Sequence, residues 1–169
     1  MTGPDRNLGR RTRSAARLAA VQAIYQIELA GAEVEAVVGE FLAHRLSPAT
    51  AEPEAASVDK ALFAELVRGV ASRRPELDSL LTRHLSESWA LDRLELVLAA
   101  ILRAATFELL ARTDVPPRVT LNEYVDVAHA FYAGKEPGFV NGVLDRIARE
   151  LRPQELDNDN RSQQTRTAG

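Results

Sequence analysis

The chain has 169 residues, of which 46% are hydrophobic and 27% are charged, and it contains no cysteine. This length suits one domain with a real core, and the lack of cysteine excludes disulfides, thiolate metal sites and a cysteine nucleophile. The net charge of −3 is unevenly spread, because residues 1–17 hold five arginines and one aspartate. This segment carries +4 and the remainder −7, so an Arg-rich arm precedes a small acidic body.

The abundance of alanine and leucine and the spacing of apolar residues predict an all-α protein. Residues 1–9 are polar and are expected to form a disordered arm. A first helix is predicted at about 10–30, before Gly31, and a second at about 34–46. The stretch 47–57 contains two prolines and no periodicity, so we expect a linker there.

Five more helices are predicted beyond the linker, at about 57 or 59 to 74, 76–85, 91–112, 120–131 and 139–151. Apolar residues surround the whole circumference of the helix at 91–112, which is typical of a central, buried helix. Thr120 and Glu123 have the spacing of a capping box and are predicted to begin the next helix. Pro153 is expected to close a folded region of 10–152, followed by a disordered tail at 153–169.

No residue pattern typical of an enzyme is present. The histidines His44, His84 and His129 lie far apart, and there is no HExxH motif, Gly-rich phosphate loop or nucleophile elbow. We therefore expect no catalytic residues, no metal site and no cofactor. The chain has neither a run of 18 apolar residues nor the order of a signal peptide, so a cytoplasmic location without membrane contact is expected.

Four arginines of the arm fall on one face of the first predicted helix. Arg6, Arg10, Arg13 and Arg17 follow one another at helical spacing, which places them within about a quarter of the circumference. Guanidinium groups bind phosphate oxygens through planar, bidentate hydrogen bonds. Because four arginines cannot be buried unpaired, we expect this face to overhang the core and to bind single-stranded RNA. A solvated helix start that binds nothing is the alternative.

Three further residues invite an interpretation. Tyr25 and Phe139 stand beside turns or basic segments and are candidates for stacking on unpaired bases, with ordinary core packing as the alternative. Arg103 lies within the apolar helix at 91–112 and is expected to pair with a buried acid such as Glu123.

Several segments together resemble the NusB family of transcription antitermination factors. They are 13–26 (RSAARLAAVQAIYQ), 65–70 (ELVRGV), 101–110 (ILRAATFELL), 114–123 (DVPPRVTLNE) and 139–145 (FVNGVLD). They span about 10–152 in the family's order, and the last motif is the most specific. One departure is the Pro137-Gly138 pair, which stands where family members often have a basic or polar residue.

The resemblance implies two packed three-helix subdomains and a regulatory protein that binds the boxA RNA of ribosomal RNA operons. It also implies a heterodimer with the small-subunit ribosomal protein that acts as NusE, and indirect association with other Nus factors and RNA polymerase. The RNA-contacting residues would be Arg13, Arg17, Tyr25 and Phe139, with Arg6, Arg10 and Arg11 supplementing them from the preceding turn.

Two other readings remain open at this stage. One is a helical module that binds only protein, for instance as a homodimer. The other is an RNA-binding domain related to that of rRNA cytosine methyltransferases, although this chain has no cysteine and no room for a catalytic domain.

Overall fold

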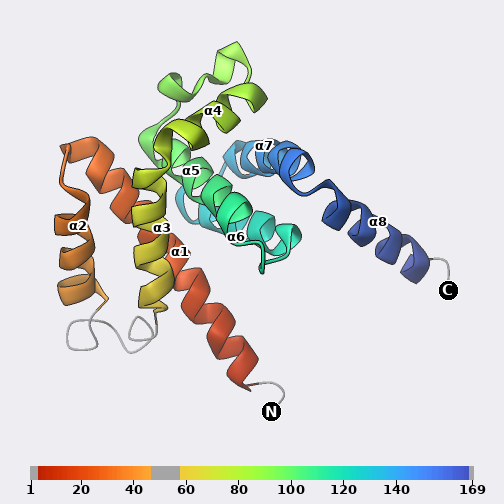
Figure 1. Ribbon diagram of the computed structural model, residues 1–169, viewed down its shortest axis with the longest axis horizontal. Coiled ribbons are helices and arrows are strands. Elements are labelled where there is room, and N and C mark those ends of the chain that lie inside the picture. Colours follow the sequence, from red (N-terminus) through yellow and green to blue (C-terminus); the bar gives the residue numbers. More distant parts are fainter. Residues whose placement is uncertain (1–3, 47–57, 168–169) are drawn as a thin grey trace.

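The computed structural model describes residues 4–46 and 58–167, and all regular structure in these ranges is helical (Figure 1). The α-helices are α1 (Pro4–Ala30), α2 (Val34–Glu40), α3 (Lys60–Ser72), α4 (Arg74–His84), α5 (Leu96–Ala111), α6 (Pro117–Phe131), α7 (Glu136–Leu151) and α8 (Pro153–Thr167). A π-helical turn, η1 (Phe41–Arg45), continues α2, and the 3-10 turns η2 (Glu87–Trp89) and η3 (Leu91–Arg93) join α4 to α5. The predicted all-α class is confirmed, whereas the predicted linker at 47–57 lies outside the described residues.

The helices form two groups around a shared central helix (Figure 1). The first group is α1, α2 and α3, and the second is α5, α6 and α7, with α4 packed against α5 and α7. Helix α5 also contacts α1 and α3, so it joins the two groups. Every residue from Leu98 to Leu109 is buried, which confirms the predicted central helix.

Helix α3 approaches α5 closely at Gly69. A Cβ atom at this position would overlap the ring of Phe107, which occupies the space of a side chain. Asp59 fixes the start of α3, because its carboxylate accepts a hydrogen bond of 3.0 Å from the backbone N–H of Leu62. The first group is therefore packed on α5 through a close glycine contact, and the cap fixes where α3 begins.

The starts of four helices differ from the prediction. Helix α5 begins at Leu96 and not near 91, because the separate 3-10 turn η3 occupies Leu91–Arg93. Helix α1 begins at Pro4, so residues 4–9 of the expected disordered arm are helical. Helix α6 begins at Pro117, and the capping box was wrong, because this proline sets the first helical turn. Helix α7 begins at Glu136, since Pro137 occupies its first turn in the same way.

Residues 153–167 form helix α8, where the sequence predicted a disordered tail. Arg152 fixes the junction, because its guanidinium donates hydrogen bonds to the carbonyl oxygens of Thr113 and Val115 at 3.0 and 2.7 Å and to the Glu155 carboxylate. Leu156 is fully buried. The described side chains beyond it are exposed, and the rest of α8 extends outward from the packed body (Figure 1).

Candidate nucleic-acid interface

The first part of α1 carries the predicted basic face. Arg6, Arg10, Arg11 and Arg13 are all exposed. Three of them, all except Arg11, line a groove of about 600 Å³ between α1 and α6, whose other wall includes Val119. The arm therefore presents guanidinium groups to solvent from a regular helix.

Arg17 also lines this groove, but it is almost wholly buried. It is only 2% exposed, and its Nε and Nη2 atoms donate hydrogen bonds of 2.9 and 2.8 Å to the Glu108 carboxylate of α5. Its Nη1 atom lies 3.5 Å from Oε2 of Glu123 on α6. The expectation that Arg17 belongs to the exposed face was wrong, because two buried carboxylates make its burial tolerable.

The surroundings of Arg17 favour its charged form. Burial alone would lower the pKa of the Arg17 guanidinium, but the hydrogen bonds and charge of Glu108 outweigh it and raise that pKa. Burial also raises the pKa of the neighbouring Tyr124 phenol well above its usual value, and the charge of Glu108 adds to this effect. The site is therefore an ion pair beside a neutral phenol.

Glu123 connects this buried pair to the groove. Its carboxylate accepts a hydrogen bond of 2.7 Å from the Ser14 hydroxyl and lies 3.7 Å from Nε of Arg10. The Arg10 side chain remains 71% exposed, so it is oriented without being sequestered. Glu123 was predicted to serve a capping box or Arg103, and its role in the groove had no local signal in the sequence.

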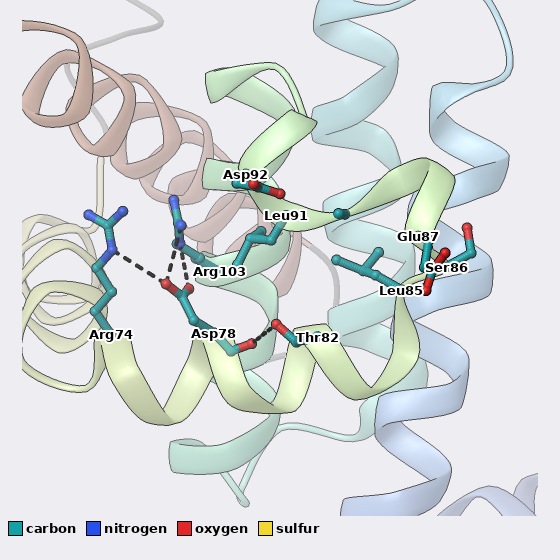
Figure 2. A pocket seen from close by; sticks show the side chains of 10 residues that line it. Arg74, Asp78, Thr82, Leu85, Ser86, Glu87, Leu91, Asp92 and Arg103 are labelled. Atoms are coloured by element: carbon teal, nitrogen blue, oxygen red, sulfur yellow. Dashed lines mark hydrogen bonds and ion pairs between the residues drawn. The ribbon is translucent and has the colours of Figure 1, made fainter.

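Arg103 pairs with Asp78 of α4, at 2.8 Å between Nε and Oδ1, and not with Glu123 as predicted. Figure 2 shows the guanidinium groups of Arg74 and Arg103 converging on Asp78 at the edge of a pocket below η2 and η3. Arg74 also pairs with Glu28 of α1. These ion pairs link α1, α4 and α5, so their charges are already neutralised within the fold.

Tyr25 lies in the second half of α1, about 18 Å along the helix from Arg13 at 1.5 Å per residue. It is half-buried and lines another groove with Gln22, Val97 and Phe131. Phe131, the last residue of α6, is 38% exposed. This groove is an apolar surface that also carries the amide of Gln22.

Phe139 is half-buried on the first turns of α7. Its ring packs partly against the core and stacks on the ring of Trp89 from η2, at 4.6 Å between ring centroids. The predicted residues are thus spread over three places: the arm, the groove beside Tyr25 and the start of α7. Trp89 was missed, because nothing near it in sequence indicates its contact with α7.

No group of three or more histidine, aspartate or glutamate residues within 4–46 and 58–167 is arranged to hold a metal ion. In the same ranges, no helix is long and apolar enough to cross a membrane.

Comparison with known proteins places the chain in a family. Residues 14–149 match the NusB family. The chain is 46% identical to the transcription antitermination protein NusB of Caulobacter vibrioides over 140 residues, which cover 83% of this chain and 94% of the relative. It is 49% identical to that of Sinorhizobium fredii, also over 140 residues, which cover 83% and 88% of the two chains.

Two solved structures share the fold. NusB of T. maritima superposes with a TM-score of 0.70 at 31% identity, covering 93% of this chain and 99% of the other. The second contains the antitermination factors NusB and NusE in complex with double-stranded RNA, and it superposes with a TM-score of 0.68 at 27% identity, covering 83% and 98% of the two chains.

Proposed function

The chain belongs to the NusB family of transcription antitermination proteins, and we propose that it binds boxA RNA of ribosomal RNA operons together with a ribosomal protein in the NusE role. The relative solved with NusE and RNA supports both partners. Such a factor would act in the cytoplasm on nascent transcripts, by recognition and assembly and without catalysis. Other Nus factors and RNA polymerase would join the assembly indirectly.

The observation that carries this proposal is the exposed arginine face of α1. Most arginines of the folded body form ion pairs, whereas Arg6, Arg11 and Arg13 form none with any residue in 4–46 or 58–167. Placing several unpaired cations near a helix N-terminus opposes the helix dipole. An RNA backbone would supply the missing negative charge.

The geometry of the arm suits a phosphate backbone. Arg6, Arg10 and Arg13 are one helical turn apart, about 5–6 Å along the axis, so each can reach a different phosphate. Glu123 holds Arg10 at the rim of the groove without covering it. Arg17 acts in this proposal as a positioning residue, because its pairing with Glu108 sets α1 against α5.

The test is a double substitution of Arg10→Ala and Arg13→Ala, measured by fluorescence anisotropy with a labelled single-stranded boxA RNA. We expect affinity to fall at least roughly tenfold, because a hydrogen bond to a charged group contributes about 1.5–3 kcal/mol. The midpoint of urea unfolding should not change. The titration is repeated with the purified ribosomal partner present.

The matched control is Arg161→Ala with Arg166→Ala, which removes the same charge from the exposed end of α8. This control should bind RNA as the parent does. If the α1 double variant also binds as the parent does, the assignment of the RNA site to the arm is refuted. If both double variants lose the same RNA affinity, the loss is explained by net charge alone.

A further inference from the structure

Trp89, Lys135 and Phe139 form a compact cluster where η2 meets the start of α7. The rings of Trp89 and Phe139 stack with an angle of 28° between their planes. The ammonium of Lys135, which immediately precedes α7, lies over the Trp89 ring at 5.1 Å from its centroid. The cluster thus places the Trp89 indole and the Lys135 ammonium next to each other, outside the core.

Trp89 has no place in the hydrophobic core. Phe139 is partly buried against the core, but Trp89 belongs neither to the core cluster nor to the apolar residues packed on it. The turn η2 contains no buried residue, and the other members of that turn, Glu87 and Ser88, are exposed. Tryptophan has the largest apolar side chain, so placing it on a polar turn, half-buried and outside the core, points to a binding role.

We propose that Trp89 is a stacking site for an unpaired base of single-stranded RNA: the base takes the place of the Lys135 ammonium over the ring, and Lys135 turns to the adjoining phosphate. The proposal rests on the proposed function and adds a residue to it. Base stacking on aromatic rings tolerates any sequence, because every base has a π-face. The ammonium of Lys135 is a mobile point charge on an exposed residue, which suits a phosphate beside a stacked base.

The position of the cluster supports RNA as the occupant. Phe131, the last residue of α6, lines the groove beside Tyr25, and only a short turn separates Phe131 from Lys135. The basic arm, this groove and the cluster therefore follow one another along α1, α6 and the start of α7. A strand held by the arm through its phosphates would meet Trp89 at the far end.

The chain contains a single tryptophan, so its intrinsic fluorescence reports on Trp89 alone. The full-length protein is titrated with unlabelled single-stranded boxA RNA, and binding is followed in parallel by anisotropy of a labelled copy. We expect saturable quenching of the fluorescence at the RNA concentrations that saturate the anisotropy. Unchanged fluorescence despite RNA binding would overturn the proposal while leaving the proposed function intact.

Two substitutions separate stacking from packing. Trp89→Phe keeps an aromatic face and should bind RNA within about threefold of the parent, whereas Trp89→Leu keeps only apolar bulk and should bind roughly tenfold more weakly. Lys135→Gln should lower the salt dependence of binding. If the Leu variant binds as the parent does, with an equal unfolding midpoint, Trp89 has no role in recognition. If the parent itself binds no RNA, both this inference and the proposed function fail.

Discussion

Arg17 lies where α1, α5 and α6 meet, and the carboxylates of Glu108 and Glu123 share its guanidinium. Its spacing from Arg13 is the same as the spacing of Arg10 from Arg6, so the sequence presents all four as one stripe. The difference between them comes from acids that lie far away along the chain, since Glu108 is 91 residues from Arg17. Helical spacing predicts which residues share a face, but not where that face enters the core.

We expect Arg17→Met to lower the free energy of unfolding by about 3–5 kcal/mol, because it leaves two buried carboxylates without their cation. Urea denaturation followed by circular dichroism measures the change. Arg13→Met, one turn earlier on the exposed face, serves as the control and should stay within about 0.5 kcal/mol of the parent. Equal stabilities of the two variants would contradict the buried ion pair.

The pairing of Arg103 is tested by a double-mutant cycle with Asp78. Arg103→Met should cost about 1–3 kcal/mol, because Asp78 loses its hydrogen-bonded partner. Adding Asp78→Leu should cost less than the sum of the two single changes. The pair Arg103→Met and Glu123→Leu should be additive, since no contact joins them. Coupling in the second cycle and none in the first would favour the original sequence-based pairing.

At the scale of elements, helices were predicted well where the signal is local. Apolar periodicity, Gly31 and the prolines define helices by their own residues, and the all-apolar circumference of α5 predicted its central place. Helix α8 was missed because only Leu156 in its sequence is anchored in the core, while Arg152 fixes its start through the carbonyl oxygens of Thr113 and Val115 in another loop. Such a cap depends on tertiary structure and leaves no periodic pattern.

The close packing of α3 on α5 predicts opposite effects for two glycines. Gly69→Ala should destabilise the protein by about 1–3 kcal/mol, because the new methyl overlaps the Phe107 ring and forces it to move. Gly39→Ala, in the exposed part of α2 with open space around it, should stabilise by about 0.5–1 kcal/mol. Thermal unfolding of both variants checks this, and a neutral Gly69→Ala would refute the contact.

The link between α4 and α7 should depend on pH. Hydrogen bonds from His84 and Arg83 lower the pKa of the Glu150 carboxyl. A lowered pKa in the folded state means that the contribution to stability is present above the ordinary value of 4.5 and is lost as the pH falls through the folded value. Glu150→Gln should therefore be less stable than the parent at about pH 7, and the difference should shrink at about pH 3.

The control for this pH dependence is Glu87→Gln, which removes an exposed carboxylate that forms no ion pair with any residue in the described ranges. Its difference from the parent should be small at both pH values. A constant deficit of Glu150→Gln across the pH range would show that its carboxylate charge is not responsible.

On the scale of the whole molecule, a net charge of −3 conceals a basic end and an acidic body. Burial of Arg17 sharpens this division, because its charge is balanced inside the protein while Arg6, Arg10, Arg11 and Arg13 stay at the surface. The acidic remainder disfavours nonspecific contact with nucleic acid. Composition was sufficient to predict this division between a basic end and an acidic body. Only the structure shows how many of the arginines are exposed.

The salt dependence of RNA binding reports how many of those arginines neutralise a phosphate. If Arg6, Arg10 and Arg13 each neutralise one phosphate, together they should contribute about −2 to the slope of log K against log salt for single-stranded RNA. The Arg10→Ala and Arg13→Ala double variant should make the slope less steep by about 1.4. Anisotropy titrations over a series of salt concentrations give both values. A flat dependence in the parent would contradict phosphate contacts by the arm.

The pairing of Arg17 with Glu108 also predicts how variants from a genetic selection would differ in protein level. A selection for cells that have lost antitermination would collect changes at Arg17 as readily as changes at Arg10 or Arg13, yet for different reasons. Variants at Arg17 should accumulate to lower levels, because a less stable protein is degraded, and lower growth temperature should partly restore them. Variants at Arg10 and Arg13 should keep normal protein levels at every temperature. Protein abundance therefore distinguishes the buried Arg17, which stabilises the fold, from Arg10 and Arg13, which we propose bind RNA.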